Sequence, residues 1–149
     1  MKGLIQRVSH ACVSVAGEEV GAIDKGVLLL LGIEKGDSRQ SADKLLHKVL
    51  NYRIFPDEED RMNLSLLNTG GGLLVVSQFT LVADTRKGMR PGFSKGASPE
   101  QGEQLYRYFA DEATKRLSRV ATGRFGANMQ ILLENDGPVT FLLEASPEE

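Results

Sequence analysis

Apolar and polar residues alternate along the first third of the chain. The alternation covers residues 4–8 and resumes at residues 11–15. A period of two residues is typical of strands with one buried face, so both segments are predicted to be strands. Residues 16–19 have the composition of a turn between hairpin arms. Residues 27–33 are apolar apart from Gly32, which predicts a central strand covered on both faces.

Two later segments show the three-and-four spacing of an amphipathic helix. In the first, apolar residues recur on one face between Ala42 and Leu50, and Asp37 with Gln40 resembles a capping pair at its start. In the second, residues 98–101 supply a serine cap, a proline at the first helical position and a glutamine three residues after the cap. This helix is expected to end near Gly123. Its apolar side consists of Leu105, Phe109, Ala113 and Leu117.

Three more strands are predicted in the second half of the chain. One covers residues 72–79, and two others cover about 128–134 and 139–144. Asp136-Gly137 lies between the last two and is a strong short-range hairpin signal. Strands grouped in hairpins, with two separated helices, predict an α+β fold: a single domain over residues 1–149, with a mainly antiparallel sheet or barrel-like core and two main helices.

Length and composition fit an ordinary globular domain. A chain of 149 residues buries roughly 70% of its unfolded surface, which is enough for a full core. The single cysteine, Cys12, cannot form a disulfide within the chain, which fits a reducing compartment. The start lacks the long apolar segment of a secretory signal, and the longest apolar run, residues 27–31, is too short to span a bilayer. We therefore expect a cytoplasmic protein without a membrane partner.

The net charge argues against a broad nucleic-acid surface. Eighteen basic and 20 acidic residues give a net charge of −2, whereas nucleic-acid-binding domains are typically basic. Any RNA contact is expected to be local, and DNA is not an expected partner. The best candidate is the segment 86–96, where Phe93 could stack on a base and the cations could reach phosphates. A solvated surface loop is the alternative. The cations are Arg86, Lys87, Arg90 and Lys95.

The familiar catalytic and metal-binding patterns are missing from the sequence. Ser77 lacks the flanking glycines of a nucleophile elbow, and nothing places His10 or His47 near it as a base. Two isolated histidines and one cysteine do not make a zinc motif, so neither a metal nor another cofactor is expected. The glycines at 70–72 lead into a strand without a following Lys-Ser/Thr, which excludes a Walker-type loop and favours a flexible turn. The acidic residues 57–60 are interpreted as a solvated loop.

Two short strings carry the most specific information. Residues 77–81 read Ser-Gln-Phe-Thr-Leu, and residues 135–140 read Asn-Asp-Gly-Pro-Val-Thr. Taken alone, the first is a strand end and the second is a turn. The first eight residues, the 87–91 loop and Gly123-Arg124-Phe125 with Met129 accompany them in order. Together these segments resemble the D-aminoacyl-tRNA deacylase family over nearly the whole chain. Gly92 departs from the family, which often has a serine there, so a hydroxyl contact from that loop is not expected.

The resemblance implies an activity. Members of this family hydrolyse the ester between a D-amino acid, or glycine, and the terminal adenosine of tRNA, including glycine mischarged on tRNA-Ala. Backbone N–H groups around Phe79 and Thr80 are the implied donors to the oxyanion. Ser77 and Gln78 are expected to shape the pocket and hold the adenosine and ribose. The hydroxyl of Thr80 is expected to position the ester, with capping of the local backbone as the alternative.

The resemblance also implies a homodimer with active sites at the subunit interface. In the family, the Gly-Pro pair is cis and enters the active site of the partner subunit. Gly137 and Pro138 would then bond the substrate's α-amino group and leave no room for an L side chain. Arg7 is the implied anchor for this turn. Phe125 and Met129 are expected to line the pocket or the dimer seam, and a core position is the alternative for both.

Two functions from other classes stay open at this point. The first is a non-catalytic homo-oligomeric RNA-binding module that uses the loop at 86–95 and leaves the ester intact. The second is a metal-free esterase that accepts small aminoacyl esters and ignores tRNA. The alternatives differ in their substrates, so hydrolysis assays separate them.

Overall fold

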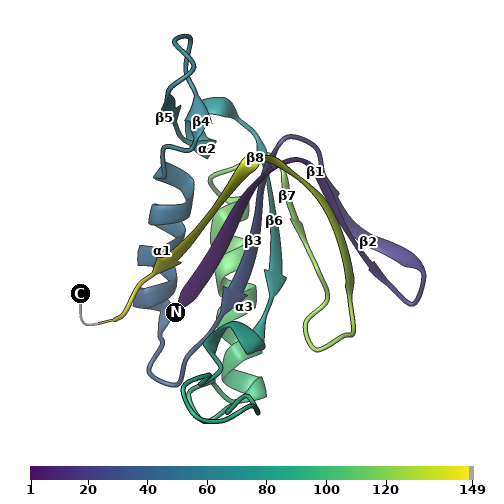
Figure 1. Ribbon diagram of the computed structural model, residues 1–149, viewed down its shortest axis with the longest axis vertical. Coiled ribbons are helices and arrows are strands. Elements are labelled where there is room, and N and C mark those ends of the chain that lie inside the picture. The colour runs from purple at the N-terminus through teal and green to yellow at the C-terminus, as the bar shows by residue number, and fades with distance from the viewer. Residues whose placement is uncertain (148–149) are drawn as a thin grey trace.

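The computed structural model describes residues 1–147. Six strands form a mixed sheet in the order β2-β1-β3-β6-β7, and β8 pairs with the free edge of β1 (Figure 1). β1 pairs antiparallel with β2, β3 and β8, whereas β6 is parallel to both β3 and β7. The sheet strands are β1 (Lys2–Val15), β2 (Glu18–Ile23), β3 (Gly26–Gly32), β6 (Gly72–Ser77), β7 (Val120–Thr122) and β8 (Gln130–Glu144).

The sheet curls into a nearly closed barrel because β1 changes partner halfway along its length. Residues 2–8 of β1 pair with β3, and residues 11–15 pair with β2. The curl brings β2 so close to β7 that a Cβ at Gly21 would lie 2.5 Å from the carbonyl oxygen of Thr122. The predicted α+β class with a barrel-like core is confirmed. The sheet is more mixed than a hairpin pattern suggests, because β3, β6 and β7 run parallel.

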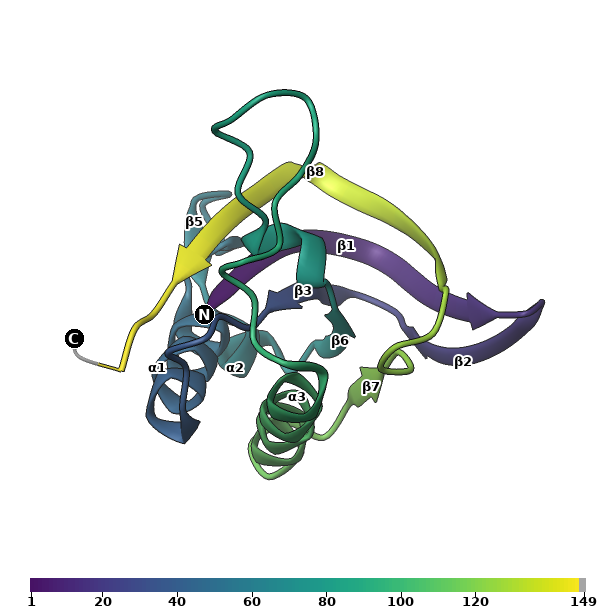
Figure 2. The same cartoon turned by 90° about the horizontal axis from the view of Figure 1, so that it is seen from below.

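Two helices cover one face of the sheet (Figure 2). α1 (Arg39–Asn51) and α3 (Pro99–Thr114) pack against β3 and β6 through a large apolar cluster that includes Leu45, Leu73 and Phe109. A second, smaller apolar cluster fills the concave side of the barrel. β3 contributes to both clusters, because Leu29 lies in the first and Leu28 in the second. The prediction of a central strand covered on both faces is therefore confirmed.

The helix ends differ in part from the prediction. Ser98 caps α3 as predicted, since its hydroxyl accepts a hydrogen bond from the N–H of Gln101 at 3.2 Å. However, α3 ends at Thr114 instead of near Gly123, because the chain turns to form β7 on the edge of β6. The predicted capping pair of α1, Asp37 with Gln40, is wrong. Ser38 is the N-cap there, and the N–H of Ser38 donates a hydrogen bond to the hydroxyl of Ser41 at 2.8 Å.

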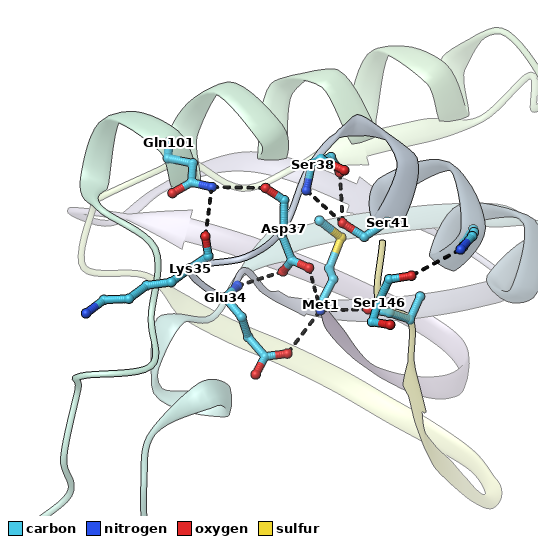
Figure 3. Close-up of polar contacts among 10 residues, drawn as sticks. Met1, Glu34, Lys35, Asp37, Ser38, Ser41, Gln101 and Ser146 are labelled. Atoms are coloured by element: carbon cyan, nitrogen blue, oxygen red, sulfur yellow. Dashed lines mark hydrogen bonds and ion pairs between the residues drawn. The ribbon is translucent and has the colours of Figure 1, made fainter. Parts of the chain in front are cut away.

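Asp37 instead binds the N-terminal ammonium group of the chain (Figure 3). Its carboxylate binds the α-ammonium group of Met1 at 2.9 Å and accepts a hydrogen bond from the N–H of Glu34 at 2.7 Å. The Met1 nitrogen also contacts the Glu34 carboxylate at 3.0 Å and the carbonyl of Ala145 at 2.9 Å. Gln101 of α3 donates to the carbonyls of Lys35 and Asp37. This cluster ties the segment 33–38 to the start of β1 and to α3.

The segment between α1 and β6 contains short elements that the sequence pattern did not predict. They form a small hairpin that extends beyond the end of α1, followed by one helical turn (Figure 1). Gly70 ends that turn in the left-handed conformation, so the glycine run is a helix cap before β6. No helix in the described chain is long and apolar enough to cross a membrane. The short elements are β4 (Phe55–Pro56), β5 (Met62–Leu64) and α2 (Leu66–Thr69).

The predicted hairpin at Asp136-Gly137 is wrong. Both halves of β8 pair with the same strand, β1, and run in the same direction along it. Asn135 pairs with Val8 and Thr140 pairs with Gln6, so the four residues 136–139 lie opposite Arg7 alone. The Asp-Gly signal therefore marks an irregular bulge, with four residues opposite one, in a single long strand. We call residues 136–139 the β8 bulge.

Candidate active site

A pocket of about 360 Å³ lies where β3 and β6 end and α3 begins. Its walls are mostly apolar, and they come from four parts of the chain: the end of β3, the end of β6 with the 3-10 turn after it, the loop before α3 with the first turn of α3, and residues 125–126. The 3-10 turn, η1 (Phe79–Val82), follows β6 directly, so the predicted strand over 72–79 stops at Ser77. Residues on the wall include Ile33, Ser77, Gln78, Phe79, Phe93 and Phe125.

The segment 77–79 lines this pocket, and Thr80 follows it in the 3-10 turn without lining the pocket. The N–H of Gln78 donates to the carbonyl of Leu31 at 2.8 Å, which fixes the segment to the end of β3. Within residues 1–147, no hydrogen bond uses the N–H groups of Phe79 or Thr80. The first N–H groups of a helical turn lack acceptors inside the turn, so they are available to a ligand. The amide of Gln78 donates to the hydroxyl of Thr80, which therefore interacts with a local side chain.

Aromatic rings form two other walls. Phe79, with 69% of its surface exposed, stacks at a tilt on Phe93 with ring centres 5.4 Å apart. Phe125 packs on Tyr106 of α3 at 5.7 Å. The hydroxyl of Tyr106 donates to the carbonyl of Val75 at 2.8 Å, and burial raises the pKa of this phenol to about 12. The sheet thus fixes Phe125 through Tyr106, while the Phe79–Phe93 pair lies at the open side.

The cationic loop borders the pocket through Phe93. Arg86 pairs with Asp84 at 3.0 Å, and its guanidinium holds the pKa of that carboxyl well below its usual range. Asp84 also pairs with Gly92 through two backbone hydrogen bonds, which closes the base of the loop. Arg86 is therefore partly committed to the loop's own structure. Lys87 and Arg90 lie exposed at its tip.

The Gly137-Pro138 peptide is cis and lies at the exposed tip of the β8 bulge. Arg7 contacts the bulge as the resemblance implied: its Nε donates to the carbonyl of Asp136 at 2.8 Å. Arg7 itself lies in β1 and pairs with Val27 of β3. The pocket begins at Leu31, four residues further along β3. At roughly 3.3 Å per residue, about 13 Å of strand separates the two places. One chain therefore does not bring the bulge to its own pocket.

The other predicted site residues are distributed unevenly. Met129 lies on the concave side of the barrel, where its sulfur would be 2.7 Å from a Cβ at Gly123, and it does not line the pocket. His10 contacts Ser9, and His47 contacts Asn51, both away from Ser77. Among residues 1–147, no group of three or more His, Cys, Asp and Glu side chains could hold a metal ion.

Sequence reasoning missed the side of the pocket that comes from Ile33 and the start of α3. Gly102 faces the ring of Phe125, and a Cβ there would lie 3.4 Å from it. The pairing of Ala97 with Ile33 through a backbone hydrogen bond of 3.0 Å brings this wall into place. The serine-proline helix start was the one sequence signal near it. The missed wall residues include Ile33, Ala97, Ser98, Pro99 and Gly102.

Comparisons with known proteins identify the family. The sequence model described as D-Tyr-tRNA(Tyr) deacylase matches residues 4–144. The chain belongs to this family. A D-aminoacyl-tRNA deacylase from Stutzerimonas stutzeri is 63% identical over 97% of this chain and 100% of the relative. Another from Pseudomonas putida is 61% identical over 97% of this chain and 99% of the relative.

Solved structures support the same fold. The c-Myc DNA Unwinding Element Binding Protein superimposes with a TM-score of 0.93 at 38% identity, covering 97% of this chain and 99% of that protein. A protein described as "a probable eukaryotic D-amino acid tRNA deacylase" superimposes with a TM-score of 0.81 at 20% identity, covering 96% of this chain and 98% of that protein. Family membership identifies the chain as an enzyme, a deacylase that hydrolyses an ester bond.

Proposed function

We propose that this deacylase hydrolyses the ester between a D-amino acid and the terminal adenosine of tRNA, and that it also accepts glycine, including glycine mischarged on tRNA-Ala. The observation that carries the proposal is the apolar and aromatic pocket at the end of β6, whose wall includes Phe79. The N–H groups of Phe79 and of the next residue, Thr80, have no acceptor among residues 1–147. Such walls suit an adenine ring, and the N–H groups suit a developing negative charge. The family assignment supports the same substrate.

The reaction needs no nucleophile from the protein. Water attacks the carbonyl carbon of the ester, the tetrahedral oxyanion forms, and the bond to the ribose oxygen breaks as that oxygen takes a proton. An aminoacyl ester is already activated, and the neighbouring ribose hydroxyl helps position the water. Phe79 and Thr80 stabilise the oxyanion through their N–H groups. Ser77 and Gln78 hold the adenosine and ribose, and the Thr80 hydroxyl positions the ester.

Chiral selection uses a second copy of the chain. The β8 bulge is exposed and remote from the pocket of its own chain, so it is free to enter another. The same strand exposes Leu132 and Leu142, with 66% and 49% of their surfaces accessible, and an apolar strand face of this kind suits a homodimer interface. In the dimer, Gly137 and Pro138 of the partner subunit lie against the substrate's α-carbon. They bond its amino group and exclude an L side chain.

The substrate's size and charge fit this arrangement. Glycine has no side chain to exclude, so it passes the same filter. A discrimination of a thousandfold between D and L esters requires about 4 kcal/mol, which a steric clash and a lost hydrogen bond can supply.

The cationic loop contacts tRNA phosphates through Lys87 and Arg90, and Arg86 and Lys95 support it. A tRNA substrate places the enzyme in the cytoplasm.

One experiment tests this function against its alternatives. The purified protein is incubated with D-tyrosyl-tRNA, L-tyrosyl-tRNA and a small D-aminoacyl ester, with a chelator present, and ester loss is followed. Rapid loss of the D-tyrosyl-tRNA ester alone supports the proposal. Salt-sensitive RNA binding without ester loss instead identifies a non-catalytic RNA-binding module. Equal cleavage of the small ester would identify a general esterase.

A further inference from the structure

The β8 bulge is held by an asparagine whose side chain takes the place of a missing strand partner. Asn135 pairs with Val8 on β1, and its side-chain amide turns back to Val139 at the far end of the bulge. Its Oδ1 accepts a hydrogen bond from the N–H of Val139 at 2.7 Å, and its Nδ2 donates to the carbonyl of Val139 at 3.2 Å. The same Nδ2 lies 3.0 Å from the hydroxyl of Thr140.

These contacts resemble the two-way pairing of opposite residues in an antiparallel ladder. The backbone of Val139 has no partner on β1, because the bulge sets four residues against Arg7. The Val139 side chain is buried in the main core, with 5% of its surface exposed. A buried backbone group without a partner is costly, so Asn135 satisfies groups that the bulge would leave unpaired.

The opposite end of the bulge is held separately. Arg7 donates from Nε to the carbonyl of Asp136 at 2.8 Å and from its terminal nitrogen to the carbonyl of Ile54 at 2.7 Å. The Arg7 side chain is 12% exposed and its bond to Ile54 is partly buried, whereas its bond to Asp136 lies at the surface. The tip, Gly137-Pro138, therefore lies between two fixed points, Asp136 on one side and Val139 on the other.

We propose that Asn135 is a positioning residue for chiral selection: it fixes the Val139 end of the bulge, and thereby the height and direction at which Gly137-Pro138 projects. This inference rests on the proposed function, in which that dipeptide excludes L side chains. A steric filter discriminates only if it does not yield. Loss of the Asn135 bonds allows the tip to move away from an L side chain, and the substrate's amino group loses its fixed partners.

A graded series of variants tests the role. Asn135→Ala removes all three bonds, Asn135→Asp keeps the acceptor for Val139 and loses the donor, and Thr140→Val removes one acceptor of that donor. The matched control is Asn128→Ala, at an exposed asparagine that precedes the same strand. For each variant, kcat/KM is measured on D-tyrosyl-tRNA and L-tyrosyl-tRNA, the oligomeric state is checked, and the hydrogen exchange of the Val139 amide is followed.

The expected order of effects follows the number of bonds lost. In Asn135→Ala the D-to-L ratio of kcat/KM falls at least about tenfold, the factor that corresponds to one buried hydrogen bond at the upper end of its usual range. The ratio falls less in Asn135→Asp, and it stays within about twofold in Thr140→Val and in the control. Exchange of the Val139 amide accelerates in Asn135→Ala. If Asn135 had only a structural role, Asn135→Ala would change the unfolding midpoint of the protein and leave the D-to-L ratio of kcat/KM unchanged.

Other results would overturn the inference. An unchanged D-to-L ratio in a folded, dimeric Asn135→Ala variant shows that Asn135 does not position the filter. If the ratio holds while Val139 exchange accelerates, the bulge loosens without any effect on selection, and the inference fails while the proposed function stands. If the unmodified protein fails to cleave the D ester at all, the proposed function fails and the selectivity role fails with it.

Discussion

The pocket at the end of β6 and the β8 bulge belong to the same sheet but differ in shape and in how their residues are held. The pocket is hollow, and Phe79 and Phe93 on its wall are half exposed or more and contact each other. The bulge is convex, and hydrogen bonds with the side chains of Arg7 and Asn135 hold its two ends. The difference fits the two tasks that we propose for these regions. Aromatic walls can adjust to a large ligand, whereas a filter that distinguishes mirror images has to keep its shape.

The largest effect is expected from a methyl group at the tip of the bulge. A Cβ at Gly137 would lie 2.8 Å from the nitrogen of Val139 and 2.6 Å from its Cγ2, and the φ of 152° favours glycine. In Gly137→Ala, hydrolysis of the D ester should fall at least about a hundredfold, because the tip must shift to relieve the clash. Single-turnover hydrolysis of D-tyrosyl-tRNA measures the loss.

The control is Gly17→Ala. Gly17 also has a positive φ, but nothing lies within 4 Å of a Cβ there. It reports the general cost of removing such a glycine, far from the site. Near-normal hydrolysis by Gly137→Ala would show that the bulge and the pocket act independently, contrary to the shared site that we propose.

The second effect concerns the support of the pocket. Asp37 binds the Met1 ammonium group, its side chain is 3% exposed, and its segment leads from Ile33 on the pocket wall to α1. Asp37→Asn leaves a buried ammonium group without its main counter-charge, so the free energy of unfolding should fall by about 3 kcal/mol. Denaturant unfolding measures this change. Glu34→Gln, whose carboxylate is 34% exposed, is the matched control and should cost less than about 1 kcal/mol.

The sequence predicted those parts of the molecule that local periodicity determines. The residues 42–50 and 98–113 have one apolar face, and β3 is apolar throughout, so these elements were found. β7 has three residues, and its place on the edge of β6 depends on distant pairing, so no pattern could reveal it. The Asp136-Gly137 signal was misleading because the long pairing with β1 overrides a local turn preference.

The candidate site divides in the same way. The segments 77–80 and 137–138 were assigned to the site only through their resemblance to a family, and the structure shows the contact of Arg7 with the bulge that this resemblance implied. The walls at Ile33, Ala97 and Gly102 come together only when β3 and α3 meet, so their sequence context shows nothing unusual. The roles of Asn135 and Asp37 were also invisible, because each depends on a partner that the fold supplies.

The third effect tests whether the pocket works through its backbone. The Thr80 hydroxyl accepts a hydrogen bond from Gln78, whereas the N–H groups of Phe79 and Thr80 have no partner among the described residues. Thr80→Ala keeps both N–H groups, so kcat should fall less than about tenfold. Single-turnover rates measure it, with Thr80→Ser as the conservative control. Abolished turnover in Thr80→Ala together with normal turnover in Thr80→Ser would make the hydroxyl essential.

The smallest effect appears only at high pH and again separates the two regions. Tyr106 supports Phe125 in the pocket, and burial raises the pKa of its phenol from 10.0 to about 12. Between these values the unfolded chain loses the proton while the folded chain keeps it, so the free energy of unfolding falls as pH rises from about 10 to 12. Tyr106→Phe removes the part of this slope that comes from Tyr106 and costs about 1 kcal/mol at neutral pH through the lost bond to Val75.

Denaturant unfolding of both proteins at pH 8 and at several values above pH 10 measures the difference. The control is Tyr52→Phe, at a tyrosine that packs on Phe141 of β8 and lies outside the pocket wall. If Tyr106→Phe keeps the full alkaline slope, Tyr106 is not its source. In that case the fixed side of the pocket is less rigid than its contact with Val75 indicates, and the contrast between an adaptable pocket and a fixed bulge becomes sharper still.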